Sequence, residues 1–241
     1  DSLLLTSTLR NALATTDVTV STANGAGTGG GKISVVSPLA WTSTHGLTLN
    51  ADGAILLGQP LSAGGDLTLN AAGNISALSE VRVGGTFTLA GGNWSQTGAL
   101  PTFAAQDFRL AAGTFVRASG GDGSASAPYL LADVYGLQGA ATLPSSTWYS
   151  LAGNIDAAGT AAWNAGQGFA PIGNGDHPYA GTFNGNGHAI AGLAIGRAGS
   201  GNVGLFSVLG TGTIKNLTLD GGSVRGGVNV GAVVGAAQAG G

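Results

Sequence analysis

Asp66 and Asp107 are the two residues whose type and spacing come nearest to a catalytic pair. Each stands one residue before the first apolar residue of a strand-like repeat, and Thr86 occupies the same position in the repeat between them. If the repeats stack as strands about 4.8 Å apart, the two carboxylates lie about 9 to 10 Å from each other, near the upper limit for an inverting glycosidase. The preference of Asp for turns favours the interpretation that both are turn residues rather than a catalytic pair.

The other acidic and histidine side chains add little chemistry. Asp176 and His177 are adjacent in an Asn-Gly-Asp-His-Pro segment, but a third catalytic group is missing, so we expect a solvated loop. His45, His177 and His188 lack the spacing of metal ligands, and no His-Glu-x-x-His motif is present. An enzyme would require two carboxylates in one groove, from among Asp66, Asp107, Asp156 and Asp176. We therefore predict no catalytic residue, no metal site and no cofactor, and assign no ligand-binding residue.

Glycine-rich segments fit nucleotide-binding motifs only in form. Residues 24–31 contain a Gly-x-Gly-x-x-Gly pattern, but the helix and the acidic residue that should follow it are absent. Gly31-Lys32 is not a phosphate loop, because Ala26 and Ile33 stand where Gly and Ser or Thr are required. We expect a flexible loop here.

Four strand-like repeats between Gly46 and Phe115 must position these groups. They read Leu47-Thr48-Leu49-Asn50, Leu67-Thr68-Leu69-Asn70, Phe87-Thr88-Leu89-Ala90 and Phe108-Arg109-Leu110-Ala111, at steps of 20, 20 and 21 residues. A glycine follows each strand, at Gly53, Gly73, Gly92 and Gly113. Strand alternation predicts an inner column of Leu47, Leu67, Phe87 and Phe108 and an outer column of Thr48, Thr68, Thr88 and Arg109. Self-similarity at this period is typical of a solenoid.

The repeats predict an all-β chain, a parallel β-helix with coils of about 20 residues. Helical repeats need roughly 33 residues or more, and helix propensity is poor here. We expect coils over residues 1–126, an irregular, aromatic-rich extension or insertion over 127–180, and further coils, truncated at the carboxy terminus, over 181–241. Further strands are expected at Val18–Val20 and Ile33–Val35, and the first 14 residues fit a short helix or a capping turn. Asn50 and Asn70 are expected to form an amide ladder at a corner, with left-handed backbone.

Composition excludes several function classes. The chain has 46 glycines, 8% charged residues and a formal net charge of -3, yet 43% of its residues are hydrophobic, so it should fold. Eight Lys and Arg without a basic cluster argue against nucleic-acid binding.

Cysteine is absent, so no disulfide forms, and no apolar run approaches the roughly 18 residues of a spanning helix. Because the sequence begins at Asp1 without Met, we interpret it as a processed or excised piece.

Three surface features allow binding or modification. The threonine column could contact ice or a flat crystal, but one column is too narrow.

Four aromatic residues fit either a sugar-stacking surface or, as we favour, packing of the irregular segment: Trp148, Tyr149, Trp163 and Tyr179. Asn-x-Ser/Thr sequons occur at Asn74, Asn93 and Asn216, where chance is favoured over glycosylation. Gly120-Gly121-Asp122-Gly123 is interpreted as a turn, because this calcium-loop-like pattern is not repeated.

Two parts of the chain resemble known families. The carboxy-terminal part resembles a GLUG repeat, found in large bacterial exoproteins and some immunoglobulin-A peptidases, over the motifs Gly204–Leu209, Gly212–Leu219, Val224–Gly226 and Val230–Gly235. The stretch from Trp163 to His188 resembles the segment that often precedes that repeat, with Asn184 where Asp is more usual. The Leu-Thr-Leu-Asn repeats resemble filamentous-haemagglutinin-like adhesins of two-partner secretion. The zinc protease activity of some GLUG-bearing proteins is not carried over, because zinc-ligand spacing is missing.

The resemblance implies a right-handed parallel β-helix that leaves a Gram-negative cell through an outer-membrane secretion partner. It also implies a large secreted or surface-attached bacterial adhesin, in which this segment is a rigid shaft that contacts a glycan or protein receptor on host cells, neighbouring cells or matrix. We expect no enzymatic activity and no membrane-spanning segment. The alternative is a β-helical carbohydrate-active enzyme, a polysaccharide lyase or hydrolase. The shaft of a toxin-delivery exoprotein is a third option.

Overall fold

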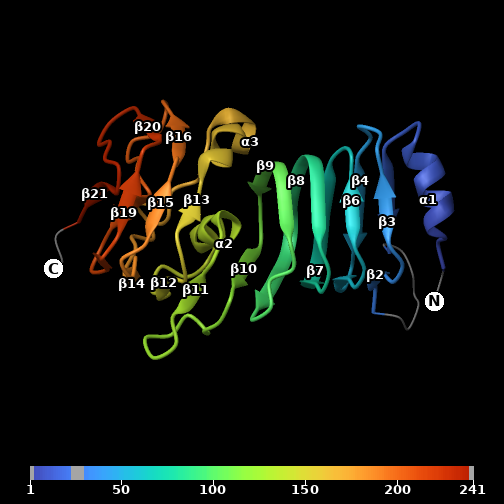
Figure 1. The fold of residues 1–241 in the computed structure, drawn as a ribbon, viewed down its shortest axis with the longest axis horizontal. Helices are drawn as coiled ribbons and strands as arrows, with labels where there is room; N and C mark the ends of the chain where they lie inside the picture. The colour runs from blue at the N-terminus through green and yellow to red at the C-terminus, as the bar shows by residue number, and fades with distance from the viewer. Residues whose placement is uncertain (1–2, 23–29, 239–241) are drawn as a thin grey trace. The chain divides into compact units, whose positions relative to one another are not determined.

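The computed structural model describes residues 3–22 and 30–238. The chain divides into two compact units, Asp1–Gln96 with Leu100–Phe115, and Thr97–Ala99 with Val116–Gly241. In each unit the strands of neighbouring repeats lie side by side and pair in parallel, while the helices are few and short (Figure 1). The prediction of an all-β chain with parallel strands is confirmed. The glycine motif predicted within residues 24–31 falls almost entirely outside the described residues.

The first unit contains three rows of parallel strand segments, and each repeat adds one segment to each row. The first row consists of β1 (Val18–Ser21), β4 (Leu47–Ala51), the start of β7 (Leu67–Ala77), the middle of β8 (Val81–Thr97) and the end of β9 (Phe103–Leu110). The second row consists of β2 (Ile33–Val35), β5 (Ile55–Leu57) and the end of β7, and β10 (Thr114–Ala118) pairs with β8. The third row consists of β3 (Leu39–Trp41), β6 (Leu61–Ala63) and the starts of β8 and β9. The strands expected at Val18 and Ile33 are confirmed.

A helix, α1 (Thr6–Leu13), precedes the first repeat, so the helical alternative for this segment is the one observed. Leu9 and Leu13 are four residues apart, lie on the same helix face and are buried. The helix packs against β1 and β3, and the Ser43 hydroxyl donates a hydrogen bond to the Leu13 carbonyl. The apolar face of α1 is therefore covered by the first repeat.

The register of the repeats follows the sequence pattern. The predicted inner column is confirmed, because its members lie opposite one another and are at most 1% exposed: Leu47, Leu67, Phe87 and Phe108. The predicted outer column is also in register and half-buried: Thr48, Thr68, Thr88 and Arg109. Thr19 extends the outer column on β1. Side chains alternate between the two faces of each strand, which separates the two columns.

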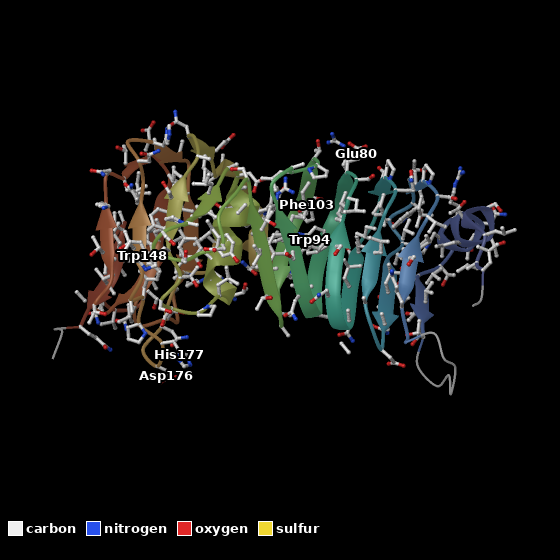
Figure 2. All side chains as sticks on the ribbon, turned by 90° about the horizontal axis from the view of Figure 1, so that it is seen from below. Glu80, Trp94, Phe103, Trp148, Asp176 and His177 are labelled. Atoms are coloured by element: carbon white, nitrogen blue, oxygen red, sulfur yellow. The ribbon has the colours of Figure 1, made fainter. Side chains whose placement is uncertain are left out.

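Five aromatic side chains fill the core at the last repeats of the first unit. They are Phe87, Trp94, Phe103, Phe108 and Phe115, none of which is more than 6% exposed. Phe87 stacks on Phe108 with ring centroids 5.4 Å apart, and Trp94 stacks on Phe115 at 5.1 Å. Phe103 contacts both pairs with its ring edge-on (Figure 2 labels Trp94 and Phe103). Aromatic contacts of these geometries stabilise a core by about 0.5–1.5 kcal/mol each beyond the area that they bury.

The glycine after each repeat strand belongs to a close-packed corner. A Cβ atom on Gly53 would lie 2.0 Å from the Gly30 carbonyl oxygen, and one on Gly113 would lie 2.0 Å from the Gly92 oxygen. Gly113 also has a φ of +83°, which side chains disfavour. The corner is looser at Gly73, where the nearest atom would be 3.2 Å away. Backbone contact between neighbouring repeats therefore explains why glycine recurs in the sequence.

The second unit contains four smaller parallel sheets among its described residues. The sheets are β11 (Tyr129–Leu131), β12 (Tyr149–Leu151), β14 (Thr182–Asn184) and β18 (Thr213–Lys215); β13 (Ile155–Asp156), β15 (Ala189–Ala191) and β19 (Thr218–Asp220); β16 (Ala194–Arg197) and β20 (Ser223–Gly226); and β17 (Phe206–Leu209) and β21 (Val234–Ala237). Helical turns connect some of these strands: α2 (Val134–Gly139), η1 (Ala140–Thr142), η2 (Ala158–Ala162) and α3 (Trp163–Gly166).

Two expectations for the second unit need correction. The segment 127–180 is not irregular throughout, because β11, β12 and β13 lie inside it, and β12 and β13 pair in parallel with β14 and β15. The step between strands is 20 residues from Tyr129 to its partner Tyr149, as predicted, but the last step is longer, because Phe183 pairs with Ile214 and Ile190 pairs with Leu219. Each of these last two repeats contributes a strand to all four sheets, whereas a repeat of the first unit contributes to three rows, so it needs more residues.

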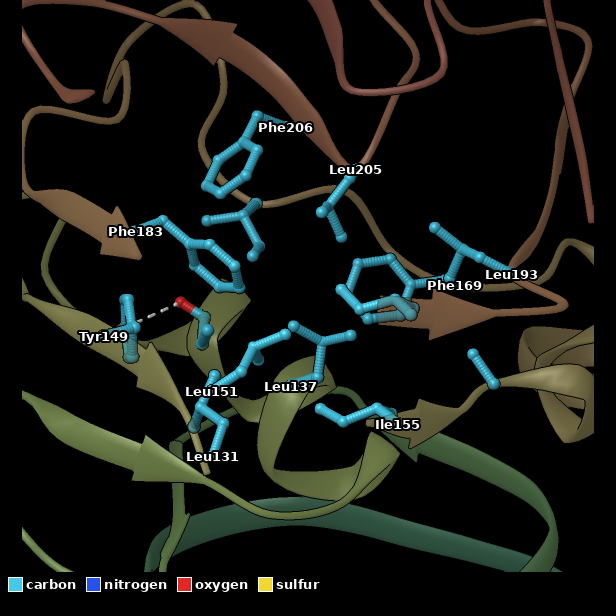
Figure 3. Close-up of a cluster of buried hydrophobic side chains, with 14 of the residues drawn as sticks. Leu131, Leu137, Tyr149, Leu151, Ile155, Phe169, Phe183, Leu193, Leu205 and Phe206 are labelled. Atoms are coloured by element: carbon cyan, nitrogen blue, oxygen red, sulfur yellow. Dashed lines mark hydrogen bonds between the residues drawn. The ribbon is translucent and has the colours of Figure 1, made fainter. Parts of the chain in front are cut away.

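The core of the second unit lies between its four sheets (Figure 3). One inward residue from each of the strands β14 to β17 is at most 1% exposed: Phe183, Ile190, Ile195 and Phe206. Leu137 of α2 joins the same cluster and is fully buried. The paired residues of the last repeat are only half-buried: Ile214, Leu219, Val224 and Val234. Among the described residues that repeat has a neighbouring repeat on one side, which explains its greater exposure.

Asparagine ladders occur, but not where the sequence predicts them. Asn50 and Asn70 lie inside β4 and β7, and neither is among the described asparagines with positive φ. Side-chain amides pair instead in the second unit, from Asn216 to Asn184 at 3.1 Å and from Asn229 to Asn202 at 2.9 Å. The donors Asn216 and Asn229 have φ of 52° and 49°, a conformation that Asn tolerates better than most residues.

Candidate binding surface

Asp66 and Asp107 occupy the positions that their spacing predicts, but the fold engages both carboxylates. Thr86 pairs with Asp107, and the Thr86 N–H donates to Asp66 Oδ1 at 2.7 Å. Arg109 donates to Asp107 Oδ2 from Nη2 at 2.6 Å and from Nε at 2.9 Å. This hydrogen bonding to Asp107 raises the pKa of Arg109, and the charge of Asp66 adds to the effect. One oxygen of each carboxylate is therefore engaged in a contact within the fold.

The expectation that both aspartates are turn residues holds for Asp66 alone. Asp66 follows a bend, whereas Asp107 lies inside strand β9 and is almost fully buried. β9 runs on from the third row to the first without a bend, which places Asp107 in a strand. Arg109, two residues later, is on the same strand face and supplies the charge that a buried carboxylate needs.

Aspartate and asparagine side chains connect neighbouring repeats at the corners. Asp17 Oδ1 accepts the Gly46 N–H at 2.8 Å and lies 3.3 Å from His45 Nδ1. Asn154 Oδ1 accepts the Ala189 N–H at 3.0 Å in the same manner. Together with the contact of Asp66, these bonds join the side chain of one repeat to the backbone of the next. Their role is to hold the repeats together.

The contacts of Asp17 predict a pH dependence. The Gly46 N–H, followed by the His45 side chain, lowers the pKa of Asp17. A carboxylate whose pKa is lower in the folded chain stabilises the fold above its unfolded pKa, and this contribution is lost as the pH falls through the folded pKa. We expect an NMR titration of Asp17 to have its midpoint below the ordinary value of 3.8 and the His45→Ala variant to raise it partway.

Asp122 provides the control for this titration. Hydrogen bonds from Ser124 lower the pKa of Asp122, so its midpoint should not respond to His45→Ala. A midpoint for Asp17 at or above 3.8 would contradict the Gly46 contact.

Asp156 is the last residue of strand β13, whereas Asp176 and His177 lie in a hydrogen-bonded bend. Asp156 Oδ1 accepts the Ala158 N–H at 3.0 Å. Asn174 Oδ1 accepts the N–H groups of Asp176 at 2.9 Å and His177 at 2.8 Å. Both side chains of the Asp176-His177 pair are exposed and lie at the rim of the second unit (Figure 2). The prediction of a solvated loop for this pair is confirmed.

Within the described part of the chain, no three His, Asp or Glu side chains are grouped as a metal site would require. His188, like His45, is half-buried, and its backbone N–H donates to the Gly185 carbonyl. None of the described helices has both the length and the apolar character needed to cross a membrane.

Three of the four candidate sugar-stacking aromatic residues are buried. Tyr149, Trp163 and Tyr179 are each 1% exposed. The tyrosine rings stack at 6.3 Å, the Tyr179 hydroxyl donates to a backbone carbonyl at 3.0 Å, and burial raises the pKa of both phenols. Trp163 stacks on Tyr135 at 5.1 Å. The packing interpretation is confirmed for these three residues, and a sugar-stacking surface that includes all four is wrong.

Trp148 differs from the other three. It stands next to the inward Tyr149 on the approach to β12, so strand alternation turns it toward solvent, and it is half-buried. In the view of Figure 2 it lies over the second unit, away from the rim that carries Asp176 and His177. Trp148 is thus the one predicted aromatic candidate that the fold leaves open to a ligand.

The remaining surface candidates are at least partly exposed to solvent but small. The threonine column has four members in register, on strands β1, β4, β7 and β8, and it stays one residue wide. The three sequon residues Asn74, Asn93 and Asn216 are exposed. Asp122 Oδ1 accepts the Ser124 N–H at 2.9 Å, which confirms the turn predicted at Gly120–Gly123.

Comparison with known proteins adds one relative. No family model matches the chain, and no solved structure matches it. Over 137 residues, or 51% of the chain, the sequence is 41% identical to halomucin from Haloquadratum walsbyi (strain DSM 16790 / HBSQ001). The chain covers 2% of the length of halomucin, so it is similar to a small segment of a far longer protein. The GLUG and haemagglutinin resemblances receive no support from these comparisons.

Proposed function

We propose that this chain is a shaft segment of a large secreted or surface-attached adhesin, that it also contacts a glycan or protein receptor, and that its strands wind as a right-handed parallel β-helix. The observation that carries the proposal is the register of the repeats. In each row of the first unit the inward residues of successive repeats lie opposite one another, as in Leu47, Leu67 and Phe87, with local register shifts where β7 and β8 pass from one row to the next. Aligned backbone hydrogen bonds and continuous apolar columns make a repeat stack stiff, which a shaft requires.

Two further observations support this function. The outward columns of the first unit carry mostly hydroxyl, amide and small side chains, as suits a surface that must stay hydrated over a great length. The similarity to a small part of halomucin fits a segment of a very long protein. The Gram-negative source implied by the haemagglutinin resemblance is not part of the proposal, because the relative is archaeal. The outer-membrane secretion partner remains an expectation of that resemblance.

The proposed function includes no catalysis. The carboxylates with the most suggestive spacing, Asp66 and Asp107, are held by a backbone N–H and by Arg109. An acid–base pair needs groups that exchange protons with a substrate, and these carboxylates already serve the fold.

Cell attachment tests the proposal. We expect the purified chain, added in excess, to reduce attachment of source cells to one another or to their natural surface, because it competes for the same ligand. The heat-unfolded chain is the control and should have no effect. Incubation with polysaccharides should release no fragments. Attachment that is unchanged at saturating concentration, or polysaccharide cleavage, would contradict the proposed function.

A further inference from the structure

Trp148 is the tryptophan whose indole has no partner in the described structure. Trp41 Nε1 donates to the His45 carbonyl at 2.8 Å, and Trp94 Nε1 donates to Gln96 Oε1 at 3.1 Å. Trp163 is buried against Tyr135, whereas the Trp148 side chain makes no ring contact or hydrogen bond with the described residues. Among the described residues, every buried side-chain nitrogen or oxygen has a hydrogen-bond partner. The indole nitrogen of Trp148 has no such partner, so it is not buried and its N–H reaches solvent.

The residues around Trp148 are fixed by the register of β11, β12, β14 and β18. Tyr149, Phe183 and Ile214 align and point inward, so their neighbours on either side point outward. We call this outward surface the Trp148 face, which consists of Trp148, Thr182, Thr213, Leu130, Ser150, Asn184 and Lys215. It presents one aromatic ring, hydroxyl groups, one amide and one cation.

The charge on the Trp148 face is positive. Lys215 is exposed and forms no ion pair within the described chain. None of the seven residues of the face is acidic. Asp122 lies in the adjoining loop, which is held by a hydrogen bond from the backbone N–H of Trp148 to the Gly123 carbonyl. The Asp122 carboxylate already accepts the backbone N–H of Ser124. An anionic ligand therefore meets a cation that no protein group neutralises.

We propose that the Trp148 face binds an acidic glycan. One sugar ring stacks on the indole, and its hydroxyl groups bond to the indole N–H and to Thr182 or Thr213. A carboxylate or sulfate further along the glycan pairs with Lys215. Ser150 and Lys215 are two strand spacings apart, about 10 Å, which a short oligosaccharide spans. This inference rests on the proposed function, since it names the ligand class and the site of the adhesin.

Binding to defined polysaccharides tests this inference. The probes are polygalacturonate, alginate and chondroitin sulfate, with methyl-esterified polygalacturonate as the neutral counterpart. We expect at least one acidic probe to bind with a salt-dependent affinity and to shift the tryptophan fluorescence. The Trp148→Ala variant should bind about tenfold more weakly, the loss expected when a stacked aromatic ring is removed. Lys215→Gln should weaken binding several-fold and reduce its salt dependence.

Matched variants separate this site from general effects. Arg225→Gln removes another exposed cation of the second unit, on β20, and should leave affinity unchanged. Trp148→Phe should retain most of the affinity but lose the fluorescence shift. Unchanged circular dichroism of all variants shows that they fold. Equal binding by Trp148→Ala and the parent chain, equal binding of the neutral probe, or no binding of any probe would overturn the inference.

The two proposals fail differently. If the chain blocks cell attachment and binds none of the acidic probes, the adhesin function stands and the glycan site is wrong. If the chain binds an acidic probe through Trp148 without affecting attachment, the site stands and the adhesin function is wrong.

Discussion

Replacing Trp94 with Ala is expected to lower the free energy of unfolding of the first unit by about 3–5 kcal/mol. Trp94 is fully buried, and its ring lies 5.1 Å from Phe115, 5.5 Å from Phe103 and 5.8 Å from Phe87. Its indole N–H also donates to the buried Gln96. The substitution therefore opens a cavity at the centre of the aromatic core and removes a hydrogen-bond donor at the same time.

Hydrogen exchange of amides in β7, β8 and β9 measures this loss, because it reports the stability of the first unit by itself. Leu78→Ala is the control. Leu78 is 67% exposed in the same unit, so truncating it should change stability by no more than about 0.5 kcal/mol. Similar exchange rates in the two variants would show that the aromatic cluster does not stabilise the unit.

Replacing Gly113 with Ala is expected to destabilise the same unit by about 3 kcal/mol, combining roughly 1–2 kcal/mol for left-handed backbone with about 1–3 kcal/mol for a steric clash. The φ of Gly113 is +83°, and the new Cβ would lie 2.0 Å from the Gly92 carbonyl oxygen. The contact joins the new Cβ atom to a backbone oxygen, and neither atom moves when a side chain changes rotamer, so a rotamer change cannot relieve the clash.

Gly73→Ala is the matched control, because Gly73 occupies the same corner two repeats earlier. Its Cβ would lie 3.2 Å from the Gly53 oxygen, and its φ is not positive. We expect a change below about 1 kcal/mol, measured by the same exchange experiment. Equal losses in the two variants would contradict the corner geometry.

The first unit was predictable because its repeats are nearly identical. Leu47, Leu67 and Phe87 recur at an almost constant step, and each alternates with an outward residue, so local pattern and global register agree. The second unit was harder to predict. The strands of its four sheets are two to four residues long and several contain small residues, as in Ala189–Ala191, so their apolar period is weak.

The candidate surface was predicted in part. Trp148 and Tyr149 are neighbours, and strand alternation alone shows that they cannot both face one ligand. Lys215 could not be linked to Trp148 from sequence, because their alignment depends on pairing across connections of unequal length. The Asp107–Arg109 pair was open to prediction, since residues two apart share a strand face.

Labelling of intact cells tests the central claim, that this chain is part of a large protein outside the cell. The probe is an antibody raised against residues 121–126, most of which are exposed in the loop between β10 and β11. We predict that it labels unpermeabilised source cells, or a very long protein in their medium. Labelling that appears only after permeabilisation would contradict the claim.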